Sequence, residues 1–303
     1  MPNWSQILDE LRDEDLKRTT NQTSSFDIVR RKHLKALSDF SGRNVICYYS
    51  GWLSKPYTFG MDIQDEDRNA FMMAVHNLDR KKGLDIILHT PGGEIAAAES
   101  IVHYLRKMFG NDVRAIVPQI AMSAGTMIAC SCKSIVMAKH SNLGPIDPQI
   151  AGIPAAAVKE EFEEAIRQIN ADSSRLAAWQ FILGKYTPTY LAKCENAVNW
   201  SKEFVKRELV ANMLSLDEDA ENISDKIVEH LTDFSSNKSH SRHIHFDECE
   251  KMGLVIERLE KKPKFQDLVL TVHHCFMHSL SNSPSIKIIE NQNGAAVIKQ
   301  SKA

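Results

Sequence analysis

The sequence has few cysteines and no long apolar run. Its 303 residues include 6 cysteines, and no two of them form a Cys-x-x-Cys pair. So few cysteines in so long a chain are typical of a reducing compartment, because a core of this size needs no disulfides. No uninterrupted stretch of about 18 apolar residues occurs, which argues against a membrane span. We therefore expect a cytoplasmic protein with no membrane span.

The sequence also lacks the features that several classes of partner require. Lys and Arg number 37 against 39 Asp and Glu, a net charge of −2, so there is no excess of basic charge to attract nucleic acid. No Gly-x-Gly-x-x-Gly turn is present, so a dinucleotide is not expected. Histidines and cysteines cluster near the C-terminus, but without a Cys-x-x-Cys pair they do not indicate a metal. The two clusters are His240, His243, His245 and Cys249, and His274, Cys275 and His278. We predict no nucleic-acid partner, no cofactor and no metal.

The distribution of apolar residues predicts an α/β fold. Short apolar runs alternate with stretches of helical spacing from residue 44 onward, which favours a largely parallel sheet covered on both faces. We expect an N-terminal helical segment (1–40), a central domain (41–234) and a C-terminal helical extension (235–303) that ends in a hairpin. The strand-like runs are Asn44–Tyr49, Leu84–His89 and Val113–Pro118.

Two turns at the ends of successive strands carry the strongest chemical signal. Gly92 and Gly93 follow one strand, where the absence of side chains leaves backbone amides free to bind a negative oxygen. Ser123 precedes an apolar helix after the next strand, with small neighbours that include Gly125. Carboxyl ends of parallel strands share one edge of a sheet. The amides of Gly93 and Ala124 are therefore expected to hold the oxyanion that forms when Ser123 attacks a carbonyl.

A serine nucleophile needs a base, and the sequence offers three candidates. The first is Lys159, on a helix stripe with apolar residues, where desolvation would favour the neutral amine. The alternative for this lysine is an exposed pair with Glu163, one turn on. His140, near Asp147, ranks second, and His89, at a strand end before the glycines, ranks third.

Three motifs in order resemble the serine dehydrogenase proteinase (SDH) family of Clp-fold serine proteinases. They are Leu84–Gly93 (LDIILHTPGG), Ala121–Met127 (AMSAGTM) and Gly144–Gln149 (GPIDPQ). The chain is more distantly similar to signal peptide peptidase A and to the proteolytic subunit of Clp protease. This resemblance implies a Clp/crotonase fold of repeated ββα units and assembly into homo-oligomers. The sequence leaves open whether a regulatory or ATPase partner exists.

The resemblance also implies roles for individual residues. Ser123 matches the nucleophile, Gly93 and Ala124 match the oxyanion hole, and Lys159 matches the lysine base of the signal-peptide-peptidase branch. The histidine of the Clp proteolytic subunits would fall near Asp147, where this chain has none. That departure favours a Ser123/Lys159 dyad over a Ser-His-Asp triad.

The function predicted from the sequence is a serine endopeptidase acting on polypeptides through an acyl-enzyme. Two alternatives use the same scaffold differently. The first is a crotonase-type acyl-CoA hydratase or thioesterase, which requires two acidic residues in the pocket and a basic cleft for the CoA phosphates; Glu94 would supply one acid. The second is a non-enzymatic oligomeric scaffold, in which Ser123 would not react with a serine probe.

Overall fold

A mostly parallel sheet forms the centre of the molecule. The computed structural model describes residues 4–17, 23–233 and 239–301. In these residues a seven-stranded sheet has the order β10-β5-β3-β2-β1-β11-β12. The pairs from β10 to β1 are parallel, whereas β11 runs antiparallel to both β1 and β12. The strands are β1 (Asn44–Ser50), β2 (Leu84–His89), β3 (Val113–Val117), β5 (Ile135–Met137), β10 (Ile256–Arg258), β11 (Ser285–Asn291) and β12 (Ala296–Gln300).

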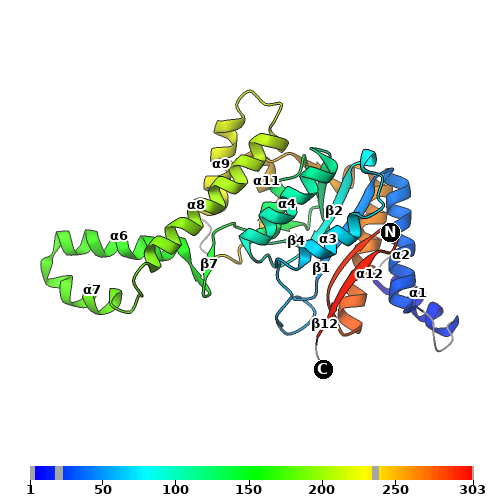
Figure 1. Ribbon diagram of the computed structural model, residues 1–303, viewed down its shortest axis with the longest axis horizontal. Coiled ribbons are helices and arrows are strands. Elements are labelled where there is room, and N and C mark those ends of the chain that lie inside the picture. The colour runs from blue at the N-terminus through cyan, green and yellow to red at the C-terminus, as the bar shows by residue number, and fades with distance from the viewer. Residues whose placement is uncertain (1–3, 18–22, 234–238, 302–303) are drawn as a thin grey trace.

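Helices cover both faces of this sheet (Figure 1). On one face α2 (Ser25–Ser41) packs along α12 (Pro263–Asn282), and α1 (Trp4–Lys17) packs beside them. The opposite face carries α3 (Asp67–Val75), α4 (Ile95–Phe109) and α5 (Ala124–Cys130). The other elements are η1 (Arg80–Lys82), β4 (Ile120–Ala121), β6 (Asn142–Leu143), β7 (Gln149–Ile150), β8 (Ile153–Pro154), η3 (Leu209–Met213), α9 (Ala220–Thr232), β9 (Ile244–His245), α11 (Phe246–Met252) and η4 (Leu259–Lys261).

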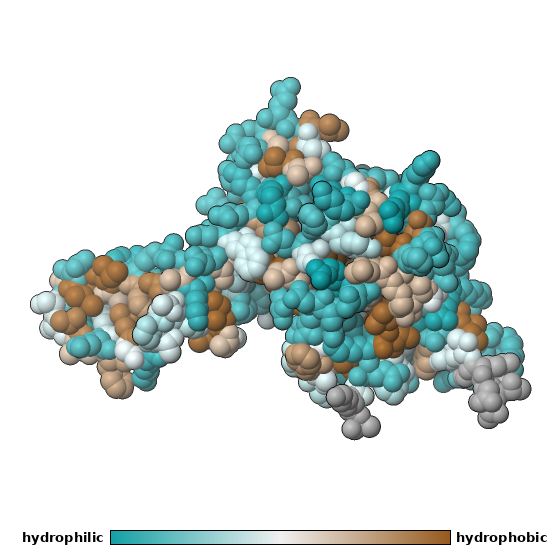
Figure 2. Space-filling model, viewed as in Figure 1, coloured by the Kyte–Doolittle hydropathy of each residue, from teal (hydrophilic) through white to brown (hydrophobic). Residues whose placement is uncertain are grey.

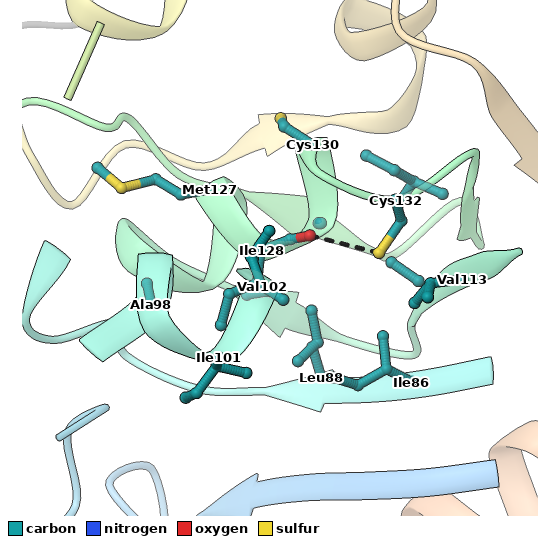
Figure 3. Close-up of a cluster of buried hydrophobic side chains, with 14 of the residues drawn as sticks. Ile86, Leu88, Ala98, Ile101, Val102, Val113, Met127, Ile128, Cys130 and Cys132 are labelled. Atoms are coloured by element: carbon teal, nitrogen blue, oxygen red, sulfur yellow. Dashed lines mark hydrogen bonds between the residues drawn. The ribbon is translucent and has the colours of Figure 1, made fainter. Parts of the chain in front are cut away.

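Side chains along the buried strands point alternately to the two faces of the sheet, and this divides the core into two parts. Ile46 and Tyr48 of β1 face the layer of α3 and α4, whereas Cys47 and Tyr49 face the layer of α2 and α12. β1 is therefore apolar on both faces, as expected of a strand in a covered parallel sheet. Figure 3 shows part of the first core, where Ile128 of α5 packs near side chains of β2 and α4. This packing fixes α5, the helix that begins directly after Ser123.

An arm of helices extends from the body. It consists of α6 (Ala155–Ala171), η2 (Ser173–Arg175), α7 (Leu176–Leu183) and the start of α8 (Tyr190–Glu208), which returns to the body (Figure 1). Apolar side chains lie on its surface, among them Ile166 at 61% exposed and Phe181 at 72% exposed. Figure 2 shows brown patches along the arm.

The structure confirms the α/β class and the largely parallel sheet. The predicted terminal hairpin is present as the antiparallel pair β11 and β12. Strands β10, β11 and β12 come from the C-terminal part of the chain and belong to the central sheet. The sheet therefore includes residues from both sides of the boundary expected near residue 234. That residue itself lies outside the described ranges. The three-part division and the repeated ββα units stay predictions. Among the described residues, no helix combines the length and the apolarity that crossing a membrane would take.

Candidate active site

Ser123 lies at a sharp turn between β4 and α5. Its backbone has φ 49° and ψ −115°, a region that residues with a side chain rarely adopt. Such strain persists where the surroundings impose it, and it concentrates at functional sites. The Ser123 side chain is partly exposed and has no hydrogen-bond partner among the described residues. The turn therefore presents a free hydroxyl at the N-terminal end of a buried helix.

The two predicted turns lie side by side, as expected from the strand ends. Thr90 and Ala121 form a parallel bridge, in which the Met122 amide donates to the Thr90 carbonyl at 3.0 Å. Gly92 contacts the nucleophile turn so closely that a Cβ on Gly92 would lie 2.7 Å from the Ser123 Cβ. Gly125 fits equally closely against Thr90, since a Cβ there would lie 2.4 Å from its Cγ2. Small residues at these positions are thus a steric requirement of the turn.

The amides of Gly93 and Ala124 are available to a ligand. Ile63 pairs with the Gly93 turn by donating its amide to the Gly92 carbonyl at 2.7 Å and accepting from the Glu94 amide at 3.0 Å. In a parallel bridge of this kind, the amide of the central residue, Gly93, points to the opposite side. Ala124 is the first residue of α5, where an amide has no partner within the helix. Neither amide donates to a protein acceptor within the described ranges.

Asp147, which the sequence offers as a carboxylate near His140, pairs instead with a histidine 93 residues further along the chain. One carboxylate oxygen, Oδ1, lies 2.8 Å from Nδ1 of His240, and the other accepts from Gln149 at 3.0 Å. The Asp147 side chain is 3% exposed, whereas that of His240 is 26% exposed. The sequence patterns single out His240 only as a candidate metal ligand. Within the described residues, no group of three or more His, Cys, Asp or Glu side chains is arranged to hold a metal.

These groups meet in one cleft of about 620 Å³. Ser123, Gly93 and His240 all line it, together with carboxylates from Asp62 and Glu94. No Lys or Arg is among the described residues that line the cleft.

Lys159 does not reach this cleft. Its side chain is 49% exposed on α6, and Nζ lies 3.8 Å from the carboxylate of Glu163, one turn on. The apolar stripe of α6 packs against α8 through Val158 and Cys194, so Lys159, the next residue along, faces outward. The desolvated environment predicted for Lys159 is therefore wrong for this chain, and the exposed ion pair is what the structure contains.

Neither of the other predicted bases is among the described residues that line the cleft with Ser123. His140 is exposed in a turn, and Asp147 pairs with His240 instead of with His140. His89 is fully buried, with Nδ1 3.2 Å from the Ser50 carbonyl and Nε2 3.1 Å from the Gln119 side chain. Because burial disfavours the imidazolium, the pKa of His89 is lowered to about 4. His89 is a neutral structural residue, and the role of base predicted for it is wrong.

The buried His89 predicts a loss of stability in acid. The unfolded chain binds a proton at His89 below the ordinary pKa of 6.5, whereas the folded chain does so only near 4. Stability from this residue is therefore complete above pH 6.5 and falls as the pH drops toward 4, by about 3 kcal/mol in total. We expect urea unfolding of His89→Gln to depend less steeply on pH in this window. An equal dependence in parent and variant would contradict the assignment, and His103→Gln, at an exposed position, is the matched control.

Comparison with known proteins gives the family. The model of the ClpP-like SDH-type serine proteinases matches residues 28–258, a range that includes every residue of the cleft. The uncharacterized protein MJ0137 of Methanocaldococcus jannaschii is 34% identical over 149 residues, covering 47% of this chain and 51% of that protein. MJ1495 of the same organism, also uncharacterized, is 36% identical over 97 residues, covering 32% and 33%. The chain thus spans about half and about a third of the length of these relatives. The extent of the family match confirms the resemblance, and the chain belongs to the ClpP-like SDH-type serine proteinase family.

Proposed function

We propose that this protein is a serine endopeptidase in which Ser123 is the nucleophile and the amides of Gly93 and Ala124 form the oxyanion hole. The observation that carries the proposal is the strained turn at Ser123, which places a free hydroxyl in a cleft beside two unpaired amides. Membership of a serine proteinase family supports the same reaction class. In this proposal the substrate is a polypeptide, bound in the cleft with its scissile carbonyl oxygen toward the two amides.

Labelling with a fluorophosphonate tests the nucleophile. Attack by the Ser123 oxygen on phosphorus expels fluoride and leaves a phosphonyl serine, which mass spectrometry of the Ser123 peptide detects. We expect labelling of the parent and hydrolysis of an unfolded protein such as casein. In Ser123→Ala both should be lost, with hydrolysis falling at least about 1000-fold.

A second serine variant controls for general effects of the substitution. Ser100 lies on α4, where its hydroxyl accepts from Arg68 at 3.2 Å, and it does not line the cleft. Ser100→Ala should keep both labelling and hydrolysis. Hydrolysis that persists in Ser123→Ala, or a parent that neither reacts with the probe nor cleaves casein, would overturn the proposal.

The crotonase-type alternative receives mixed support from the cleft. Asp62 supplies the second carboxylate that a hydratase would require beside Glu94, and it accepts a hydrogen bond from the Tyr57 hydroxyl. The basic groups needed to bind the CoA phosphates are missing from the described lining of the cleft. The charge of the cleft thus favours the peptidase. The oligomeric scaffold, homo-oligomerisation, a regulatory or ATPase partner and a cytoplasmic location remain predictions from the sequence.

A further inference from the structure

The backbone of Ile63 sets the position of the Gly93 turn. Ile63 is fully buried, and its amide and carbonyl form the hydrogen bonds to Gly92 and Glu94 that hold the turn. The contact leaves no space between them, since a Cβ on Gly93 would lie 2.3 Å from the Ile63 carbonyl oxygen. Where the Gly93 amide points therefore depends on where Ile63 lies.

Two buried side chains of opposite charge hold the residues on either side of Ile63. Lys287 of β11 donates from Nζ to the Asp62 carbonyl at 2.6 Å. Asp67, the first residue of α3, accepts from the Gln64 amide at 3.0 Å. These two side chains also pair with each other, because Nζ of Lys287 lies 2.9 Å from each carboxylate oxygen of Asp67. The backbone on both sides of Ile63 is thus tied to one ion pair.

The ion pair is buried and its polar atoms are satisfied. The side chains of Lys287 and Asp67 are 3% and 4% exposed. The ammonium has three hydrogen-bond acceptors, the Asp62 carbonyl and the two carboxylate oxygens. The carboxylate also accepts from the hydroxyl of Tyr48 at 2.9 Å, which fixes the pair to β1 in the central sheet. A charge pair removed from water is held firmly only when it is bonded in this complete way.

From this arrangement we infer that Lys287 and Asp67 are positioning residues, which hold the Gly93 amide, through Ile63, at the place where the oxyanion forms. Neither is among the described residues that line the cleft, so neither touches the substrate. The inference rests on the proposed peptidase function. It adds that the oxyanion hole depends on β11, a strand beyond residue 258, where the family match ends.

Loss of the Lys287 ammonium would release the Asp62 carbonyl and leave the Asp67 carboxylate without its counter-charge. The segment 62–64 then moves, and the Gly93 amide moves with it. A shift of about 1 Å in a group that acts on the transition state can lower the rate about 100-fold. The oxyanion forms only when Ser123 attacks, so its stabilisation affects the transition state and not the binding of the substrate. The effect should therefore appear in kcat and not in KM.

Kinetics of Lys287→Met test the inference. Methionine keeps an unbranched apolar chain of similar length and removes the ammonium. We expect kcat on casein-derived peptides to fall about 10- to 100-fold, with KM within about threefold of the parent. Lys299→Met is the matched control, because Lys299 lies opposite Lys287 on β12 and pairs with Glu66 instead. It should keep both constants within about twofold of the parent.

A peptide aldehyde separates positioning from a general loss of structure. The Ser123 hydroxyl adds across the aldehyde carbonyl to give a hemiacetal, whose former carbonyl oxygen lies at the place of the oxyanion. In Lys287→Met the inhibition constant of the aldehyde should rise by the factor by which kcat/KM falls. A smaller folded fraction would lower the measured kcat but leave the inhibition constant unchanged.

A double variant serves if Lys287→Met does not fold, as judged by circular dichroism. Lys287→Met, Asp67→Asn removes both buried charges, and the asparagine side-chain oxygen can still accept from the Gln64 amide. The Asp62 carbonyl stays without its donor. We expect the unfolding midpoint in urea to recover toward that of the parent while kcat stays low. Recovery of kcat together with the midpoint would show that the pair only stabilises the fold.

The outcomes separate this inference from the proposed function. If Ser123→Ala loses hydrolysis while a folded Lys287→Met, or the folded double variant, keeps the kcat and the aldehyde affinity of the parent, the inference fails and the peptidase stands. If Ser123→Ala stays active, the proposed function itself fails.

Discussion

Replacing Gly93 with alanine is expected to lower the rate of peptide hydrolysis at least a hundredfold. Gly93 has φ 151°, and a Cβ there would lie 2.3 Å from the carbonyl oxygen of Ile63 and 2.4 Å from its amide nitrogen. Both obstacles are backbone atoms, so the turn itself must move. Its amide then leaves the position proposed for the oxyanion, and loss of one such donor costs about 10²–10³ in kcat. The measurement is kcat on a peptide substrate, with circular dichroism to show that the variant is folded.

Another glycine with positive φ provides the control for backbone strain. Gly42, at the C-terminal end of α2, has φ 68°, and a Cβ there would meet nothing within 4 Å. Gly42→Ala should cost about 1 kcal/mol of stability through its left-handed backbone and leave kcat unchanged. A folded Gly93→Ala variant with the kcat of the parent would show that this amide does not contribute to catalysis.

The second large effect is expected on stability, when Glu290 of β11 becomes glutamine. Glu290 is fully buried between two arginines of α2: it pairs with Arg30, itself 1% exposed, and accepts from Arg31 at 2.7 Å. The substitution keeps the shape but leaves a buried guanidinium without its principal counter-charge. Breaking a buried pair in this way costs about 3–5 kcal/mol. Urea denaturation should show that loss as a lower unfolding midpoint.

Two further variants make this result interpretable. The double variant Arg30→Met, Glu290→Leu removes both buried charges together and should be less destabilised than Glu290→Gln alone. Lys35→Ala breaks an exposed pair with Asp39 on the same helix and should cost no more than about 0.5 kcal/mol. Equal midpoints for Glu290→Gln and Lys35→Ala would contradict the importance given to the buried pair.

Local sequence patterns predicted much of the fold and the two turns that meet at the site. Leu84–His89 is buried at every position because β2 is covered on both faces, and the strand has the bounds that its sequence indicates. The rule that parallel strands end at one edge correctly brought Gly92 beside Ser123. These features depend on neighbours in sequence or on a general property of parallel sheets, so one chain suffices to predict them.

The pairing of Asp147 with His240 could not be predicted in the same way. His240 acquires its partner Asp147 from a loop 93 residues earlier, and nothing local marks either residue for the other. The one available signal was negative: no histidine stands near Asp147 in the sequence, where the resemblance would place one. The desolvated position predicted for Lys159 was wrong for a related reason. An apolar stripe shows that another element covers that side of the helix, but it does not identify the element. In α6 the covering element is α8.

The position of β11 has a consequence for how the chain is made. β1 is paired with β2 on one side, but its other edge is closed by β11, with Tyr49 opposite Ile288. During synthesis on the ribosome, that edge and the arginines of α2 have neither β11 nor the Glu290 carboxylate as a partner until β11 has emerged. An open strand edge is a template for pairing with other chains. The nascent protein therefore depends on late completion of its sheet, and chaperones that shield β1 in the meantime would raise the yield of folded molecules.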